Sequence, residues 1–251
     1  MSEYYLLNHI GTHVDAPAHQ TAGGDTLDEI ALHDLVKCPS SSTKATADRA
    51  DYHPEMDEIA LVPERTALIN VDLQRHFVDS ASDGLAVVDS VNRLAAACRE
   101  AGVLVIHTRH VLRPDGSNMG VLAAIPKIRA GLLNEGADSA AFHQALVLDP
   151  HDILLEKPRF GAFYGTDLEL ILRARGIDTV IISGISTPVC CDTTAREAQA
   201  RDFRVLFLSD ATATTGPDGA QFQLATLEVL DGLFAQVLTV EELLQKIARA
   251  P

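Results

Sequence analysis

The chain has 251 residues, of which 47% are hydrophobic and 22% charged, and its formal net charge is −15. An acidic chain of this kind repels phosphate backbones and anionic headgroups, which argues against nucleic-acid and membrane partners. No stretch approaches the roughly 18 apolar residues of a membrane span, and the polar start is unlike a signal peptide. We therefore expect a cytoplasmic protein with reduced thiols.

The N-terminal part of the chain differs from the rest. Residues 1–37 are rich in histidine and acid, whereas residues 38–58 are polar and contain two prolines and a run of serines. The second pattern is typical of a linker or an irregular surface segment. We predict three parts: a fragment at 1–37, a linker or irregular segment at 38–63, and one domain at 64–251, a length that suffices for a sizeable core.

From residue 66 onward, short apolar runs alternate with helical patterns. Continuous apolar strands separated by helices predict an α/β fold, a doubly wound, mostly parallel open sheet of about six strands with helices on both faces. No G-x-G-x-x-G follows the first strand, so a dinucleotide site is not supported. We predict that the protein uses no cofactor. The predicted strands are 66–72, 103–109, 152–157, 177–184, 203–210 and 235–240, and the predicted helices are 85–102, 120–133, 166–176, 188–201, 219–233 and 241 onward.

Three residues with useful chemistry lie at the ends of predicted strands. Asp72 ends the first strand, Lys157 ends the third, and Cys190 follows the fourth at the start of a helix. The carboxyl ends of parallel strands meet at one edge, where such sheets place their chemistry. A lysine and a helix N-terminus favour a thiolate, and a carboxylate can take the proton. Each residue alone has an ordinary structural explanation, and only the combination indicates a nucleophilic site.

The segments that carry these residues resemble the isochorismatase-like cysteine hydrolases over residues 64–240. INVDLQRHF (69–77) is similar to the first conserved block of that family, and residues 156–198 are similar to the second and third. The resemblance implies that Asp72 is the general base, Lys157 a charge stabiliser and Cys190 the nucleophile. It also implies a cis bond between Ile185 and Ser186, so that the backbone N–H groups of Ser186 and Cys190 form an oxyanion hole.

The resemblance also bears on the residues around this site. Cys191 is expected to be a buried packing residue, and Arg109 is either a substrate reader or part of a structural ion pair. The stretch 107–118 lacks the Asp-x-His-Pro pattern of metal-assisted nicotinamidases, so no metal is predicted at the hydrolase site. The expected pocket residues are Gln74, Phe77, Arg109, His110, Phe160 and Phe163.

These observations predict a hydrolase that cleaves a small amide, ureide or carbamoyl C–N bond through a thioester. The expected partner is a small amide-type substrate, and the resemblance implies a homo-oligomer. A non-catalytic binding domain with the same fold is one alternative. A vinyl-ether hydrolase within the same family is another, which the sequence does not discriminate.

The N-terminal stretch 8–36 resembles a different family, the cyclases and kynurenine formamidases, through the motif H-x-G-T-H-x-D-x-P-x-H. That resemblance implies that His9, His13 and Asp15 bind a divalent metal and that His19 lies near a catalytic centre. We prefer to interpret the stretch as a remnant, because it matches over only about thirty residues. A metal-dependent formamidase-type hydrolase is the alternative that it leaves open.

Overall fold

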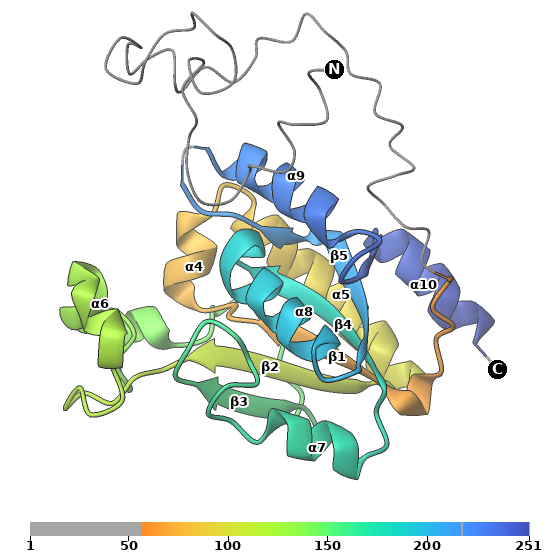
Figure 1. Ribbon diagram of the computed structural model, residues 1–251, viewed down its shortest axis with the longest axis horizontal. Helices are drawn as coiled ribbons and strands as arrows, with labels where there is room; N and C mark the ends of the chain where they lie inside the picture. The colour runs from red at the N-terminus through yellow and green to blue at the C-terminus, as the bar shows by residue number, and fades with distance from the viewer. Residues whose placement is uncertain (1–56, 217, 251) are drawn as a thin grey trace, which may run out of the picture. The chain divides into compact units, whose positions relative to one another are not determined.

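The computed structural model describes residues 57–216 and 218–250. The chain divides into two units, Met1–Arg49 and Ala50–Pro251, and the described residues belong to the second. In them, one open sheet has the strand order β3-β2-β1-β4-β5-β6, and every pair of neighbouring strands is parallel (Figure 1). The strands are β1 (Thr66–Val71), β2 (Leu104–His110), β3 (Ile153–Lys157), β4 (Thr179–Ile185), β5 (Arg204–Ala213) and β6 (Gln236–Leu238).

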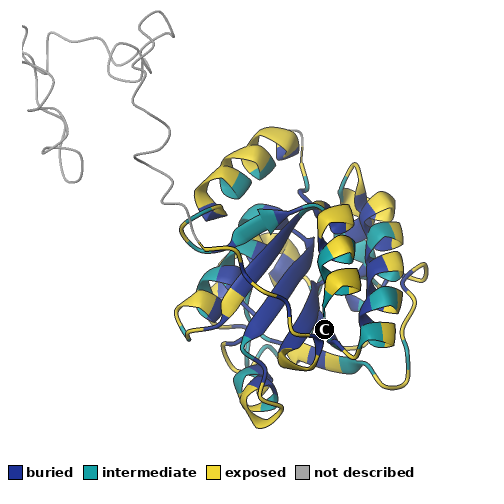
Figure 2. Ribbon diagram, turned by 90° about the vertical axis from the view of Figure 1, so that its right-hand side faces the viewer, coloured by how far each residue is buried: buried dark blue, intermediate teal, exposed yellow. Residues whose placement is uncertain are grey.

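Helices cover both faces of the sheet, as Figures 1 and 2 show. The α5 and α10 side chains share one apolar core with one face of the strands, and the α7 and α8 side chains share a second core with the other face. This is the predicted doubly wound α/β fold, which the structure confirms. The helices are α4 (Arg75–Ser80), α5 (Gly84–Ala101), α6 (Pro126–Arg129), α7 (Leu168–Ala174), α8 (Asp192–Gln199), α9 (Gly219–Leu230) and α10 (Val240–Arg249).

The central strand β1 shows why this pattern requires two covered faces. All six of its residues are buried. Successive side chains of a strand point to opposite faces, so Leu68 enters the core on the α5 side while Ile69 enters the core on the α7 and α8 side. A strand without a polar face is stable only when helices shield it on both sides.

The prediction of one helix over 120–133 is wrong. The structure has a 3-10 helix at Gly120–Ala124, followed by the short α6, which begins at Pro126. Proline disfavours a helical conformation in the residue before it, and Ile125 is extended (φ −86°, ψ 112°). The predicted helix over 188–201 is also divided, because a π-helical turn at Thr187–Cys191 precedes α8. The short α4 is a further helix that the sequence did not predict.

The backbones of β1 and β4 approach closely just before the predicted catalytic aspartate. Gly184 has φ 116°, and a Cβ atom there would lie 2.0 Å from the Val71 carbonyl oxygen. Only glycine fits this conformation and this space. Asp72, the residue that follows β1, has φ 51°, in the left-handed region that few residues other than glycine, asparagine and aspartate adopt.

No helix in the described part of the chain is long and apolar enough to span a membrane.

Candidate active site

The structure brings the predicted carboxylate and ammonium together at the carboxyl edge of the sheet. Asp72 follows β1, and Lys157 is the last residue of β3. The Lys157 Nζ lies 2.7 Å from the Asp72 Oδ2, and neither side chain is exposed. A buried pair of this kind is held by mutual charge, and losing either partner would leave the other charge without compensation.

Three groups surround the Lys157 ammonium. Besides contacting Asp72, its Nζ donates to the backbone carbonyls of Arg159 (2.9 Å) and Phe160 (2.8 Å). Burial acts to lower the pKa of Lys157, but Asp72 and Cys190 outweigh it, so this pKa lies above its usual value. Because an ammonium has three donors, this lysine acts as a fixed positive charge rather than as a donor to a ligand.

Thr108 on β2 orients the carboxylate, a role that the sequence interpretation missed. Its Oγ1 donates to the Asp72 Oδ1 at 2.8 Å, and the Asp72 backbone N–H in turn faces the Thr108 Oγ1 (3.2 Å) and carbonyl oxygen (3.1 Å). Both side chains are fully buried. The signal was present in the sequence, since Thr108 shares a strand face with His110 by the period of two.

Cys190 lies in the π-helical turn that follows β4 and is only 2% exposed. The charges of Asp72 and Lys157 both act on its thiol. Burial raises the pKa of Cys190 to about 12, although Lys157 and the Ser186 N–H act in the opposite direction. Lys157 therefore has the predicted sign of effect, but desolvation outweighs it, and the resting group is a thiol rather than a thiolate.

The backbone before Cys190 has the conformation that the resemblance implied. The Ile185–Ser186 peptide bond is cis, and the Ser186 N–H acts to lower the pKa of the Cys190 thiol. The Ser186 carbonyl accepts hydrogen bonds from the N–H groups of Val189 (3.2 Å) and Cys191 (3.1 Å), which fixes the turn. The Ser186 N–H is thus a candidate oxyanion donor near the predicted nucleophile.

Two further predicted pocket residues lie beside this group. The buried His110 is the register partner of Lys157 in the β2–β3 pair, and its ring packs edge-on against Phe160 with centroids 5.6 Å apart. Gln74 is buried as well, but its amide is occupied: Oε1 accepts from the His110 N–H (2.7 Å), and Nε2 donates to the carbonyls of His110 (3.1 Å) and Ala140 (2.8 Å). Gln74 therefore holds the backbone that carries His110.

The structure does not bring Arg109 and Phe163 to the group. Arg109 pairs with Glu156 and stacks over Phe142 on the other face of the sheet, because adjacent strand residues point in opposite directions. Phe163 packs against Phe203 with ring centroids 5.8 Å apart, inside the core on the α7 and α8 side. Phe77 is partly buried against two apolar clusters.

Cys191 occupies a different environment from its neighbour. It is fully buried in the same core, and its Sγ points to the Ser183 carbonyl at 3.8 Å. Its pKa is raised well above the usual value by burial. These contacts agree with a packing residue, as expected from the sequence.

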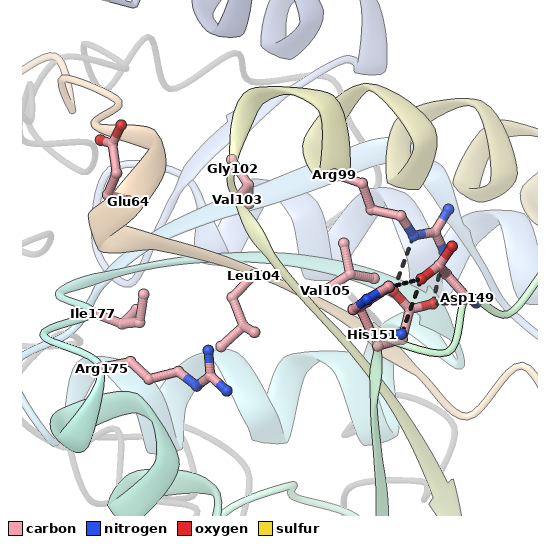
Figure 3. Close-up of a pocket in the computed structure, with 11 residues that line it drawn as sticks. Glu64, Arg99, Gly102, Val103, Leu104, Val105, Asp149, His151, Arg175 and Ile177 are labelled. Atoms are coloured by element: carbon pink, nitrogen blue, oxygen red, sulfur yellow. Dashed lines mark hydrogen bonds and ion pairs between the residues drawn. The ribbon is translucent and has the colours of Figure 1, made fainter.

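Cavity size does not identify the site. A hollow of about 610 Å³ lies where β1, β2 and β4 begin, at the edge opposite Cys190, with Arg175 and Glu64 on one side and Arg99, Asp149 and His151 on the other (Figure 3). A second hollow of about 210 Å³ lies beside Arg109. We assign the candidate site by its chemistry, because among the described residues only the carboxyl edge joins a thiol, a carboxylate and an ammonium.

The predicted metal ligands His9, His13 and Asp15 lie outside the described residues, as does His19. Within residues 57–216 and 218–250, no group of three or more His, Cys, Asp or Glu side chains is arranged to hold a metal ion. The metal site of the N-terminal stretch stays a prediction.

Known proteins match most of the described chain. The isochorismatase domain family model matches residues 66–242. Ureidoacrylate amidohydrolase RutB of Methylobacterium radiotolerans is 31% identical over 220 residues, which are 78% of this chain and 85% of that protein. RutB of Enterobacter sp. is 30% identical, over 74% of this chain and 90% of that protein.

Solved structures agree with this match. A cysteine hydrolase from Pseudomonas syringae pv. phaseolicola superposes with a TM-score of 0.75 at 32% identity, covering 78% of this chain and 99% of that one. An isochorismatase family protein from Burkholderia thailandensis superposes with a TM-score of 0.67 at 30% identity, covering 76% and 100%. A second family model, the cyclase model, matches residues 2–119, so that likeness extends well beyond the stretch that carries the motif.

Proposed function

The chain belongs to the isochorismatase family, and from this premise we propose that it is a cysteine hydrolase of a small amide, ureide or carbamoyl C–N bond, with Asp72, Lys157 and Cys190 as its catalytic triad. The observation that carries the proposal is the burial of the three groups together: Asp72 pairs with Lys157 at 2.7 Å, and the charges of both act on the Cys190 thiol. The RutB relatives, named as ureidoacrylate amidohydrolases, support a ureide as the substrate.

The first step must remove the thiol proton. Because the pKa of Cys190 is about 12, little thiolate exists before substrate binds. Asp72 takes the proton as the sulfur attacks the carbonyl carbon, and the C=O electrons move to the oxygen. The Ser186 and Cys190 N–H groups stabilise that oxyanion, and Lys157 supplies a fixed positive charge beside Asp72.

Collapse of the tetrahedral intermediate breaks the C–N bond. The amine or ammonia leaves with the proton that Asp72 had taken, and a thioester to Cys190 remains. Water then attacks the thioester, Asp72 takes a proton from that water, and the sulfur leaves and regains a proton from Asp72. The same carboxyl group acts as base and then as acid in each half of the reaction, which requires a position that both the thiol and the substrate nitrogen can reach.

The experiment uses the full chain with ureidoacrylate and a panel of small ureides, carbamoyl compounds and amides, and measures ammonia or amine release. Cys190→Ala and Cys190→Ser should lose at least about a thousandfold in kcat while keeping the melting temperature. Cys98→Ala is the matched control, since Cys98 is a buried thiol of α5 in the opposite core. A Cys190→Ala variant with wild-type turnover would remove the proposal.

The cyclase match favours a second candidate, a metal-dependent formamidase-type hydrolase that uses His9, His13 and Asp15. The two candidates respond to different inhibitors. Alkylation of the thiol with iodoacetamide stops the cysteine hydrolase, whereas a chelator such as EDTA stops the metal-dependent one. A protein with neither activity would instead be a binding domain.

We further propose that the chain forms homo-oligomers in the cytoplasm. Helix α9 supports association, because within it only Gly219 and Leu230 are buried, while Phe222 (55% exposed) and Leu224 (69% exposed) face solvent. An apolar surface helix of this kind is typical of an interface. Light scattering of Phe222→Asp and Leu224→Asp variants should report a smaller mass than that of the wild type, and an unchanged mass would contradict this role of α9.

A further inference from the structure

His110 is a buried histidine that the mechanism above does not use. Its side chain has no exposure, and neither Nδ1 nor Nε2 forms a hydrogen bond with the described residues. A buried polar atom without a partner is costly, and such atoms are rare in folded proteins. The unpaired ring of His110 lies immediately beside the pair of Asp72 and Lys157, whose charges act on it.

The surrounding residues hold this ring in place without forming hydrogen bonds to its nitrogens. Gln74 clamps the His110 backbone on both its N–H and its carbonyl, and Phe160 packs edge-on against the imidazole. The Lys157 ammonium contacts Asp72 and two backbone carbonyls, so it does not donate to the imidazole. The arrangement is that of a preorganised group awaiting a ligand rather than of a member of a structural network.

The chemistry of the ring defines what it can bind. Burial, together with the neighbouring Lys157, lowers the pKa of His110 to about 4, so the ring is neutral at neutral pH. A neutral imidazole has one N–H donor and one acceptor nitrogen. Because neither nitrogen has a hydrogen-bond partner among the described residues, the acceptor nitrogen lacks a donor in either tautomer.

We propose that the acceptor nitrogen of His110 binds an N–H of the scissile amide or ureide group, which makes His110 a specificity-determining residue that selects amides over esters. This inference rests on the proposed function, since it concerns the substrate of the same site. An ester has no N–H at that position and leaves the nitrogen unpaired. A carboxylate does not bind there either, because it offers only hydrogen-bond acceptors. Sites built to bind one polar group discriminate strongly against analogues that lack it.

The experiment measures how fast iodoacetamide and methyl iodoacetate alkylate Cys190 in the full chain, by intact mass and peptide mapping. The two reagents differ in the amide N–H group, and their rates with free cysteine correct for intrinsic reactivity. In the wild type the corrected amide-to-ester ratio should be about tenfold or more. His110→Leu should reduce that ratio about tenfold, and His110→Gln, which keeps an acceptor, should restore part of it.

Two results would overturn the inference: a wild-type ratio equal to that of free cysteine, or an unchanged ratio in His110→Leu. The first requires no variant, so it decides the matter even if His110→Leu does not fold. Release of ammonia from ureides tests the proposed function separately. Turnover without selectivity refutes the role of His110 alone, whereas selectivity without any turnover refutes the proposed function and leaves the N–H site.

Discussion

Two buried polar groups lie on opposite faces of the same strands, and they differ in how completely their hydrogen bonds are formed. One is the proposed catalytic group on the α7 and α8 side, made by Asp72, Thr108, His110, Lys157 and Cys190. The other, which we call the cross-strand row, lies on the α5 side and is made by Ser183, Asn70, His107, Asp152 and Arg99.

Each polar side chain of the cross-strand row has its partners. The Ser183 hydroxyl donates to Asn70 Oδ1 (2.6 Å), and Asn70 Nδ2 contacts His107 Nδ1 (3.3 Å). His107 Nε2 contacts Asp152 Oδ2 (3.1 Å), and Arg99 binds both oxygens of Asp152 (2.9 and 2.7 Å). The row crosses from β4 through β1 and β2 to the turn before β3, so it ties the strands in register.

The catalytic group is not satisfied in this way. It leaves both nitrogens of His110 unpaired, keeps Asp72 at a positive φ and holds a thiol against a carboxylate and an ammonium. A complete polar network adds rigidity, whereas an incomplete one costs stability unless a ligand completes it. The comparison teaches that unmet hydrogen bonds, and not polarity itself, distinguish the functional face from the structural one.

The largest effect is expected from Lys157→Met. Removing the ammonium leaves the buried Asp72 carboxylate unpaired, so the free energy of unfolding should fall by about 3–5 kcal/mol, and turnover should be lost. Urea denaturation and ammonia release measure the two effects. The double variant Asp72→Asn with Lys157→Met removes both charges and should recover most of the stability but no turnover. Recovery of activity would show that the pair is structural only.

Acid should act on both faces through their histidines. Burial lowers the pKa of His107 and of His110 from 6.5 to about 4. Between these pH values the unfolded chain binds a proton at each imidazole and the folded chain does not. Stability is then complete above pH 6.5 and is lost as the pH falls toward 4, by about 3 kcal/mol for each imidazole. Denaturation curves across this range measure the loss. His107→Leu should remove about half of it, and an unaltered pH dependence would contradict this origin.

A matched pair of substitutions then separates the two faces. His107→Leu leaves the Asn70 amide unpaired and should lower the free energy of unfolding by about 1–3 kcal/mol, while kcat/KM stays within about threefold. His110→Leu breaks no formed hydrogen bond, so its stability should change little while kcat/KM for the amide substrate falls. Thermal melts and kinetics of both variants check this. Equal losses of stability would erase the distinction.

The smallest effect is expected from Thr108→Val, which keeps the side-chain shape and removes the hydroxyl bound to Asp72. Loss of this orienting contact should lower kcat about tenfold with little change in KM, because the hydroxyl acts on the base and not on the substrate. Thr108→Ser keeps the hydroxyl and should retain most of the activity. A change in KM alone would contradict the positioning role.

The fold was largely predictable because its signal is local and repeated. The buried β1 and the amphipathic α5 follow directly from apolar runs and helical periodicity, and together they imply a covered parallel sheet. The failures also have local causes. The helix predicted over 120–133 ignored the restriction that Pro126 places on Ile125, and the assignment of both Arg109 and His110 to one pocket ignored the alternation of strand side chains.

The sequence by itself determined the class of sheet, the alternation of strands and helices, and the positions of Asp72, Lys157 and Cys190 at or after strand ends, since these depend on patterns read along the chain. Only the tertiary structure decided that Thr108 orients the base, that Gln74 braces a backbone, and that Phe163 belongs to the core. It also decided that burial leaves Cys190 protonated and His110 unpaired. These properties depend on register between strands and on the loss of water, which arise only when distant segments pack together.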